Sequence, residues 1–331
     1  METRHLGRTS LLVSRIGLGL AALGRPGYIN IGHADDLERH YDAEAMEAHC
    51  HTVLDAAWEL GVRYFDAARS YGRAEEFLAN WLPKRKLQPA EITIGSKWGY
   101  TYTAQWRVEA EHQEIKNHTL PILHKQAAES RNLLGDHLDL YQIHSATLES
   151  GVLDDRAVLE ELARMRDSGL RVGLSVSGPK QADTLNRAMD IRIGGKRLFD
   201  CVQATWNLLE PSAGLALQAA HHAGMGVIVK EALANGRLTS RNADPGFGAK
   251  RRILEEEARR LETTLDGLAL AAVLTQPWVD VVLSGAATVD QLRSNLGSLT
   301  VKWDKRVAQQ IESVAETPEE YWGKRSGLAW N

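Results

Sequence analysis

The sequence has few cysteines, no long apolar run and only a small excess of charge. Cys50 and Cys201 are the only cysteines among its 331 residues, so no disulfide framework is expected and a reducing compartment is favoured. No stretch approaches the ~18 apolar residues of a membrane-spanning helix, and the N-terminal residues carry no apolar signal core. The net charge of −4 gives no basis for binding nucleic acid or an anionic membrane. We therefore expect a cytoplasmic protein that acts on a small molecule, with its oligomeric state left open.

What the sequence does contain is enough apolar material for one large core. Hydrophobic residues make up 44% of the chain and charged residues 25%, as in ordinary globular proteins. The length exceeds that of most single domains, but α/β barrels reach this size as one unit. Neither a low-complexity linker nor an internal repeat of about 20–50 residues interrupts the chain. We therefore expect one domain over residues 1–331.

Strand-like and helix-like patterns alternate along the chain. A hairpin is expected at residues 4–13, around Gly7-Arg8-Thr9-Ser10. Strands are then expected at 15–19, 64–67, 92–97, 138–144, 171–175, 199–204, 226–230 and 279–284. Helices are expected at 43–60, 74–81, 120–134, 155–168, 181–189, 213–223, about 249–275 and 289–296, with an extra C-terminal helix at 304–315. Eight such units favour an α/β fold of the (β/α)8 TIM-barrel type over a doubly wound sheet. Long segments at 24–43, 99–118 and 317–331 would then shape a pocket at the C-terminal face of the barrel.

The stretch from Gly61 to Gly72 is the most informative part of the sequence. Residues 64–67 read as a short buried strand that contains Asp66, and Tyr71 follows on the next loop. An acid at the end of a strand and a phenol on the next loop can meet at one mouth of a barrel. Taken alone, the pattern also fits Asp66 capping the helix at Ala74, with Tyr71 packed beneath that helix.

Polar residues also stand at the ends of the other expected strands. In chain order the strand ends are Gly19, Asp66, Lys97, His144, Ser175, Gln203, Lys230 and Ser284. In a barrel these ends converge at the face where barrel enzymes carry out their chemistry. Because buried charge without a function is costly, we interpret the set as an active site rather than as packing.

Tyr71 and three of these strand-end groups suit one kind of chemistry. The phenol of Tyr71 has an ordinary pKa of ~10, and a nearby Lys97 ammonium would favour the phenolate. Asp66 would hold Lys97, and His144 would donate a hydrogen bond to a carbonyl oxygen. Such a site exchanges a proton with a carbonyl or an alcohol while a cofactor moves hydride. No metal-ligand constellation stands at the strand ends, which disfavours a metal-dependent hydrolase.

Five segments resemble motifs of the aldo-keto reductases and together span nearly the full chain. They are Leu-Gly-Arg-Thr-Ser at 6–10, Tyr-Phe-Asp-Ala-Ala-Arg-Ser-Tyr-Gly at 64–72, Ser-Lys-Trp-Gly at 96–99, Leu-Asp-Leu-Tyr-Gln-Ile-His at 138–144 and Ser-Gly-Ala-Ala-Thr at 284–288. The resemblance implies that Tyr71 is the general acid/base, that Lys97 and Asp66 tune it, and that His144 orients the carbonyl. It also implies a nicotinamide cofactor bound on a barrel, without a Rossmann fold.

The resemblance further implies where that cofactor binds. Ser175 and Gln203 would hold the carboxamide, residues 233–238 would lie over the pyrophosphate, and residues 285–295 would hold the adenosine end. The expected cofactor contacts are Gly19, Leu20, Asp66, Ser175, Gln203, Lys230, Glu231, Leu233, Ala234, Gly236, Leu238, Gly285, Ala287, Thr288, Gln291 and Asn295. The expected substrate contacts are Trp98, Tyr100 and Trp206.

Three departures from the family pattern concern the cofactor. Lys230 stands where the family often stacks an aromatic ring on the nicotinamide, and Ser175-Val176 replaces a frequent Ser-Asn pair. Residues 285–290 contain no basic side chain for a 2′-phosphate, which leaves Arg293 and residues 250–252 as candidates. We therefore expect NADPH to be preferred by no more than about 10²-fold, with NADH also used.

One short motif would suggest a Rossmann fold instead of a barrel. Residues 17–22 match the G-x-G-x-x-G/A dinucleotide pattern, but Gly24 and Pro26 follow at once, so no helix opens there.

The expected function is reversible NAD(P)H-dependent reduction of an aldehyde or ketone. The alternative is a cofactor-binding regulatory subunit of the same fold with little turnover.

Overall fold

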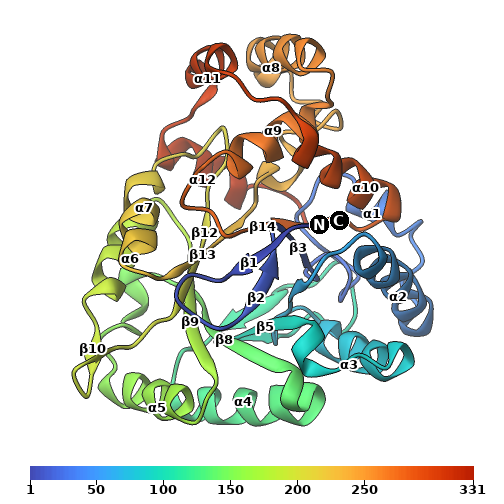
Figure 1. Cartoon of the computed structure of the whole chain (residues 1–331). Coiled ribbons are helices and arrows are strands. Elements are labelled where there is room, and N and C mark those ends of the chain that lie inside the picture. The colour runs from blue at the N-terminus through green and yellow to red at the C-terminus, as the bar shows by residue number, and fades with distance from the viewer.

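A computed structural model describes all 331 residues, and its centre is a closed barrel of eight parallel strands (Figure 1). Strands that are neighbours in the barrel are also neighbours in the sequence, and the last strand closes the ring by pairing with the first. The barrel strands are β3 (Ile16–Gly19), β4 (Tyr64–Asp66), β5 (Thr93–Trp98), β8 (Leu138–Ala146), β9 (Arg171–Val176), β12 (Cys201–Thr205), β13 (Gly226–Lys230) and β14 (Val281–Ser284). All eight predicted strands are present, and the predicted (β/α)8 barrel is confirmed.

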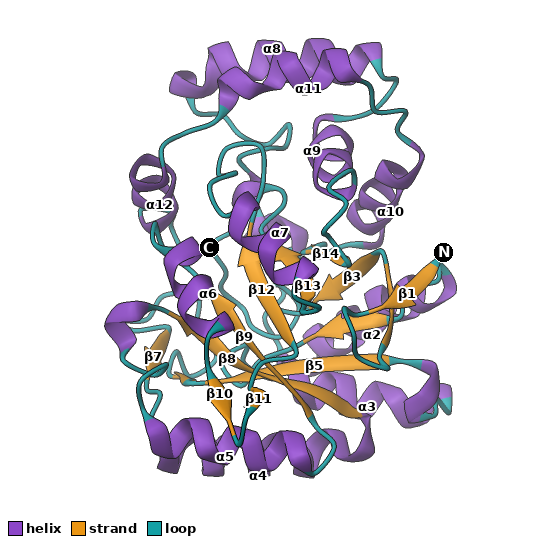
Figure 2. Cartoon of the chain, turned by 60° about the vertical axis from the view of Figure 1, so that its left-hand side comes forward, coloured by secondary structure: helices purple, strands orange, loops and turns teal.

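Helices follow every barrel strand and surround the barrel. They are α2 (Ala43–Glu59), α3 (Ala74–Arg85), α4 (Leu120–Leu134), α5 (Arg156–Asp167), α6 (Gln181–Met189), α7 (Gly214–His222), the pair α8 (Gly248–Arg260) and α9 (Leu265–Leu274), and α10 (Val289–Gly297). Except for α8, their inward faces and the strands form one large apolar core, whereas α8 packs with part of α9 in a second, smaller apolar cluster. In Figure 2, α8 lies beside α11 (Lys305–Ile311) at the top of the molecule, away from the barrel. The predicted extra helix is therefore present as α11, which continues into a 3₁₀ turn at Glu312–Val314.

The predicted N-terminal hairpin closes one end of the barrel. It consists of β1 (Thr3–His5) and β2 (Leu12–Ser14) and crosses the barrel at the centre of Figure 1. Leu6, at its turn, is fully buried in a small apolar cluster with Tyr64 and Leu140 from the barrel strands. The Gly7 amide donates a hydrogen bond to Asp280 Oδ2 at 3.1 Å, just before β14. The hairpin thus fills the N-terminal end and leaves the C-terminal ends of the strands for a site.

Four short elements lie where no regular structure was predicted. They are α1 (His33–Asp36), the hairpin of β6 (Tyr100–Tyr102) and β7 (Glu114–Lys116), the hairpin of β10 (Arg192–Ile193) and β11 (Lys196–Arg197), and α12 (Pro318–Ser326). The strands of these hairpins have two or three residues, too few to show an alternating pattern. Helix α12 does carry a start signal, since Thr317 caps it and Pro318 is its first residue.

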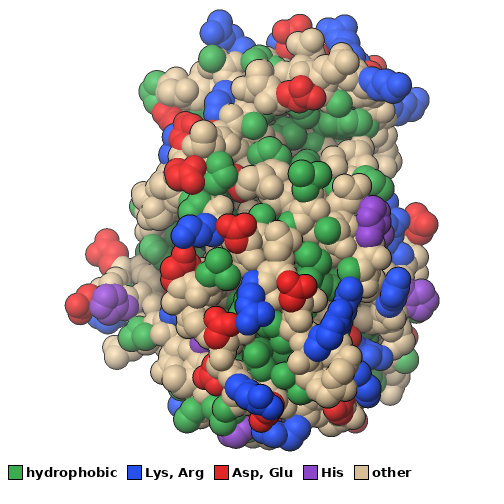
Figure 3. Space-filling view, turned by 90° about the vertical axis from the view of Figure 1, so that its left-hand side faces the viewer, with side chains coloured by type: hydrophobic (Ala, Val, Ile, Leu, Met, Phe, Trp, Pro, Cys, Tyr) green, Lys and Arg blue, Asp and Glu red, His purple; other side chains and the backbone are tan.

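The outer surface is mixed in charge. On the face drawn in Figure 3, acidic and basic side chains are interspersed, without a broad patch of one sign. None of the helices is both long enough and apolar enough to span a bilayer.

Candidate active site

Asp66, Tyr71, Lys97 and His144 come together at the C-terminal end of the barrel. Lys97 Nζ donates to the Asp66 carboxylate, to the Ala67 carbonyl at 2.9 Å and to the Tyr71 hydroxyl at 3.3 Å. Lys97 and Asp66 are almost completely buried on neighbouring strands, β5 and β4. The ammonium is therefore fixed between a carboxylate and a phenol.

Side chains inside the barrel also hold the Asp66 carboxylate in place. Its Oδ1 accepts hydrogen bonds from the Tyr64 hydroxyl at 3.1 Å and from Gln203 Nε2 at 2.9 Å. Tyr64 fits inside the barrel because two neighbours are glycines. A Cβ at Gly95 would lie 2.5 Å from the Tyr64 hydroxyl, and one at Gly17 would lie 2.8 Å from its ring. Gly17, part of the apparent dinucleotide pattern, thus serves packing.

Tyr71 is placed by a close crossing of two loops. A Cβ at Gly24 would lie 2.3 Å from the Tyr71 carbonyl oxygen, and Gly72 has a left-handed φ of +61°. The Arg73 amide donates to the Gly24 carbonyl at 2.8 Å. Only glycine fits at such a close approach. The loop before α3 is thereby tied to the loop after β3, with the phenol directed at Lys97.

His144, on β8, faces Tyr71 edge to face, with ring centroids 5.5 Å apart. Its Nδ1 lies 3.4 Å from Ser70 Oγ, and its ring lines a cavity. Burial, followed by the positive charge of Lys97, lowers the pKa of His144 well below its usual value. The imidazole is therefore neutral at physiological pH and has one N–H to donate.

The phenol of Tyr71 does not behave as the sequence led us to expect. Burial, followed by the Asp66 charge, raises its pKa well above the usual value. Burial and the Asp66 charge outweigh the lowering expected from Lys97, whose ammonium is already paired with Asp66. Tyr71 therefore keeps its proton at neutral pH in this structure.

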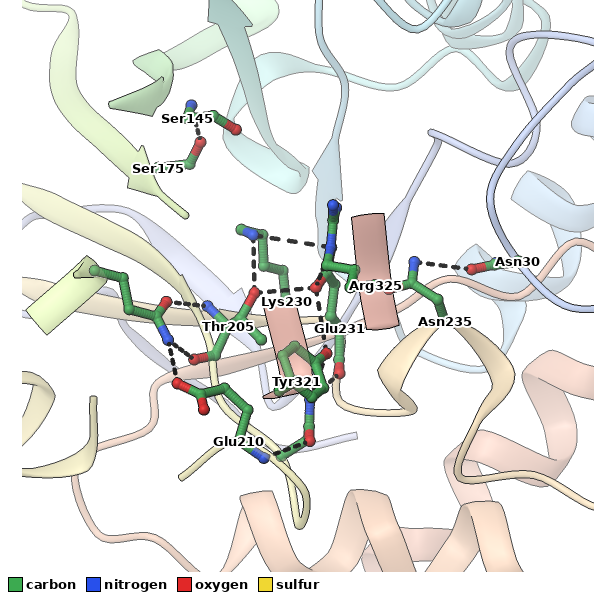
Figure 4. Close-up of polar contacts among 12 residues, drawn as sticks. Asn30, Ser145, Ser175, Thr205, Glu210, Lys230, Glu231, Asn235, Tyr321 and Arg325 are labelled. Atoms are coloured by element: carbon green, nitrogen blue, oxygen red, sulfur yellow. Dashed lines mark hydrogen bonds and ion pairs between the residues drawn. The ribbon is translucent and has the colours of Figure 1, made fainter. Parts of the chain in front are cut away.

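A cavity of about 640 Å³ extends from Tyr71 and His144 to the start of α10. Ten of the expected cofactor contacts line it: Gly19, Asp66, Gln203, Lys230, Glu231, Leu233, Gly236, Gly285, Gln291 and Asn295. Six others do not line it: Leu20, Ser175, Ala234, Leu238, Ala287 and Thr288. Ser175 Oγ accepts a hydrogen bond from the Ser145 amide at 2.8 Å, a pair that Figure 4 shows apart from the other contacts. Thr288 caps α10 by accepting from the Gln291 amide at 3.2 Å.

The expected substrate aromatics are placed differently from one another. Trp98 is buried against His118, and Trp206 packs against Trp278, so neither lines the cavity. Tyr100 lies beside His144, with ring centroids 4.9 Å apart, but it does not line the cavity either. Tyr28 and Trp330 do line the cavity wall, and of these two aromatic residues Tyr28 was not predicted.

Arg25 is the cation that sequence reasoning missed near Tyr71. It is almost fully buried, and its guanidinium lies 5.3 Å from the Tyr71 ring centroid and 4.8 Å from that of Trp330. It pairs with Glu114 of β7 at 2.9 Å. Its partners come from distant loops, so no local pattern pointed to it.

The C-terminal segment completes the wall through a buried ion pair. Arg325 of α12 contacts the Glu231 carboxylate through Nε at 2.8 Å and Nη2 at 2.5 Å (Figure 4). Burial alone would raise the pKa of Glu231, but Arg325 and Lys230 outweigh it and lower that pKa to about 2. Lys230 Nζ donates to Thr205 Oγ1 at 2.9 Å, and burial lowers its pKa to about 8. Asn331 exchanges backbone hydrogen bonds with Tyr28 at 3.1 Å, which fixes the end of the chain against the loop after β3.

Comparisons with known proteins agree with this architecture. The model of the aldo/keto reductase family matches residues 15–316. Uncharacterized oxidoreductase YrpG of Bacillus subtilis is 24% identical over 352 residues, covering 97% of this chain and 99% of that protein. The NADH-specific methylglyoxal reductase of Escherichia coli is 24% identical over 348 residues, covering 96% and 100%. The holo structure of an aldo-keto reductase from Bacillus halodurans shares the fold with a TM-score of 0.72 at 20% identity, covering 96% of this chain and 97% of that one. The match of the family model over most of its length shows that the chain belongs to the aldo/keto reductase family of oxidoreductases.

Proposed function

We propose that this protein catalyses the reversible reduction of an aldehyde or ketone to an alcohol with a nicotinamide cofactor. The observation that carries the proposal is the Tyr71 hydroxyl, which lies 3.3 Å from Lys97 Nζ at a cavity that His144 also lines. Because its pKa is raised, the phenol holds a proton that it can give to a carbonyl oxygen. The neutral imidazole of His144 would orient that oxygen by donating a hydrogen bond.

Each residue then has a defined task during reduction. Tyr71 gives its proton to the carbonyl oxygen, and Lys97 stabilises the phenolate that is left. Asp66 keeps Lys97 charged and in place. The bound nicotinamide supplies hydride in this direction and accepts it in the other. Alcohol oxidation needs the phenolate first, so it should gain with rising pH more than reduction does.

The cavity suits a dinucleotide. Its volume of about 640 Å³ lies within the roughly 300–1,000 Å³ of small-molecule sites. The amides of Gln203, Gln291 and Asn295 line it, and Lys230 adds a cation. Asn235, also on the wall, has a buried Oδ1 without a partner, which a bound ligand could satisfy. We assign cofactor contact to the ten predicted residues on the wall, with Ser175 and the other five shaping it from behind.

For the substrate we propose the space beside Tyr71 and His144. Tyr28, Trp330 and Arg25 line it there, and Tyr100 supports His144 from the side. Trp98 and Trp206 would act only through packing. The relative named as a methylglyoxal reductase supports a small carbonyl compound as the class. The sequence favoured NADPH by no more than about 10²-fold, whereas the contacts of Asp36 described below argue for NADH.

A panel of aldehydes, ketones and alcohols followed by nicotinamide absorbance, with both cofactors, tests the proposal. We expect turnover of at least one carbonyl compound with NADH or NADPH. A regulatory subunit would instead bind a cofactor, seen as a change in tryptophan fluorescence, without measurable turnover of any compound. Absence of cofactor binding would contradict both functions.

A further inference from the structure

We propose that Asp36 makes the cofactor site selective for NAD(H) over NADP(H). The proposal rests on the nicotinamide cofactor of the proposed function and on the adenosine end lying against residues 285–295. It reverses the preference expected from the sequence. Its basis is the position of Asp36, which comes from the loop after β3 and lines the cavity together with Gln291 of α10.

The Asp36 carboxylate is held rigidly at this position. Its side chain is only 7% exposed, and it pairs with Arg241 through both oxygens, at 2.5 and 2.8 Å. Gln291 Nε2 donates to Asp36 Oδ1 at 2.8 Å. The amide of Gln291 cannot turn over freely, because its Oε1 accepts from the Ala287 amide at 2.9 Å. The carboxylate is therefore presented to the cavity in one orientation.

Asp36 still has capacity to accept a hydrogen bond. An ionised carboxylate offers about four acceptor sites, and Arg241 and Gln291 use two on Oδ1 and one on Oδ2. A ribose 2′-hydroxyl can donate to the remaining site. A 2′-phosphate has a charge of about −1.5 to −2 at pH 7 and would meet a carboxylate where it needs a cation.

The surrounding charges point in the same direction. The ionisable side chains on the wall at this end are Asp36, Asp266, Asp290 and Arg241, three carboxylates against one guanidinium. Arg241 is held by Asp36 and by the Gly32 carbonyl at 3.2 Å. These contacts use three of its five N–H donors and pair its charge with the Asp36 carboxylate.

None of the cations suggested by the sequence, Arg293 and residues 250–252, lines the cavity. The Arg293 side chain is 66% exposed, lies 3.7 Å from Asp290 and does not line the cavity. Lys250 pairs with Glu316 at 3.1 Å, also away from the wall. The wall at this end therefore offers a 2′-phosphate no cation other than Arg241, which is paired with Asp36.

Calorimetric titration with ADP-ribose and with 2′-phospho-ADP-ribose tests the proposal without any hydride transfer. The wild type should bind ADP-ribose at least tenfold more tightly, within the roughly 10- to 150-fold that one charged hydrogen bond is worth. In Asp36→Asn the ratio of the two dissociation constants should fall by at least tenfold. Asp35→Asn is the matched control, because Asp35 is the neighbouring aspartate on α1, is 73% exposed and does not line the cavity; it should leave the ratio within about threefold.

A second variant distinguishes the effect of Asp36 on the binding preference from that of Arg241. Arg241→Met should keep or increase the preference for ADP-ribose, because it removes the one cation on the cavity wall at this end. Tighter binding of 2′-phospho-ADP-ribose by the wild type, lost in Arg241→Met, would show that Arg241 is a phosphate clamp and would overturn the proposal. A ratio unchanged in folded Asp36→Asn, checked by its circular dichroism, would also overturn it. Failure of the wild type to bind either compound would instead contradict the cofactor site itself, and this inference with it.

Discussion

The two ends of the cavity are built in different ways. At the catalytic end, Asp66, Lys97 and His144 stand on three successive barrel strands and are held by the barrel interior. At the other end, the Asp36 carboxylate and its partner Arg241 come from two loops, 205 residues apart in sequence. In the proposed function, the strands hold Asp66, Lys97 and His144, and Tyr71 comes from the loop that follows β4. The loops at the other end could then change the choice of cofactor and substrate without disturbing these four groups. This division is the one expected of a barrel with its active site at the C-terminal face.

The C-terminal segment extends the contrast. Arg325 forms an ion pair with Glu231, and Asn331 contacts Tyr28. These contacts hold a part of the cavity wall that belongs to no barrel strand. Substitutions at the end of the cavity that barrel strands form should therefore lower both the stability of the protein and its activity. Removing parts of the loop-borne wall should chiefly affect stability and ligand binding.

The largest effect is expected from Lys97→Met. It removes the cation beside the Tyr71 hydroxyl and leaves Asp66 buried without its counter-charge. We expect alcohol oxidation to fall by at least about 10², with its pH profile shifted upwards, and the free energy of unfolding to fall by about 3–5 kcal/mol.

Urea unfolding and the oxidation pH profile check both expectations for Lys97. The double variant Lys97→Met/Asp66→Asn removes the unpaired charge as well, so it should regain stability without regaining activity. An oxidation profile unchanged in Lys97→Met would contradict the coupling between Lys97 and Tyr71.

A smaller loss of stability is expected from Arg325→Met, on helix α12 of the C-terminal segment. It leaves the buried Glu231 with Lys230, 4.0 Å away, as its remaining cation, and should cost about 3 kcal/mol of unfolding free energy. Arg164→Met, which breaks an exposed ion pair with Glu161 on α5, is the control and should cost no more than about 0.5 kcal/mol. Equal losses in the two variants would mean that the α12 contact does not anchor the wall.

The smallest effect concerns the pH dependence of stability at Lys230. Burial lowers its pKa from the ordinary 10.5 to about 8 in the folded protein. Between these values the unfolded chain holds a proton that the folded chain has lost, so the free energy of unfolding rises with pH. From pH 7 to pH 9 the wild type should gain about 1 kcal/mol relative to Lys230→Met. A difference between the two proteins that stays constant over this range would argue against a buried, destabilised ammonium.

The contrast between the two ends also explains what the sequence could predict. Asp66, Lys97 and His144 lie at or near the ends of β4, β5 and β8, after mostly apolar residues, so their convergence at one end of the barrel could be predicted from local patterns. Asp36, Arg25 and Trp330 stand in segments without periodicity and acquire their partners only through the fold. Trp98 and Trp206 show the converse limit, because an aromatic near a strand end can pack behind the wall as readily as line it.

Some of the missed structure did leave a local signal. Thr317-Pro318 is a typical helix start, and it could have indicated α12 and with it the position of Arg325. The protonation of Tyr71 could not be predicted in this way. It depends first on the burial of the phenol and then on its distance from the Asp66 charge, both of which are set by the three-dimensional structure.

The central claim is that Tyr71 is the proton donor in an otherwise intact cofactor site. The most direct measurement compares Tyr71→Phe with Tyr41→Phe, whose tyrosine lies outside the cavity, in both cofactor affinity and the rate of carbonyl reduction. We predict that Tyr71→Phe binds the cofactor as the wild type does but reduces the carbonyl at least about 10²-fold more slowly, while Tyr41→Phe changes neither. Carbonyl reduction by Tyr71→Phe at a rate close to that of the wild type would contradict the account.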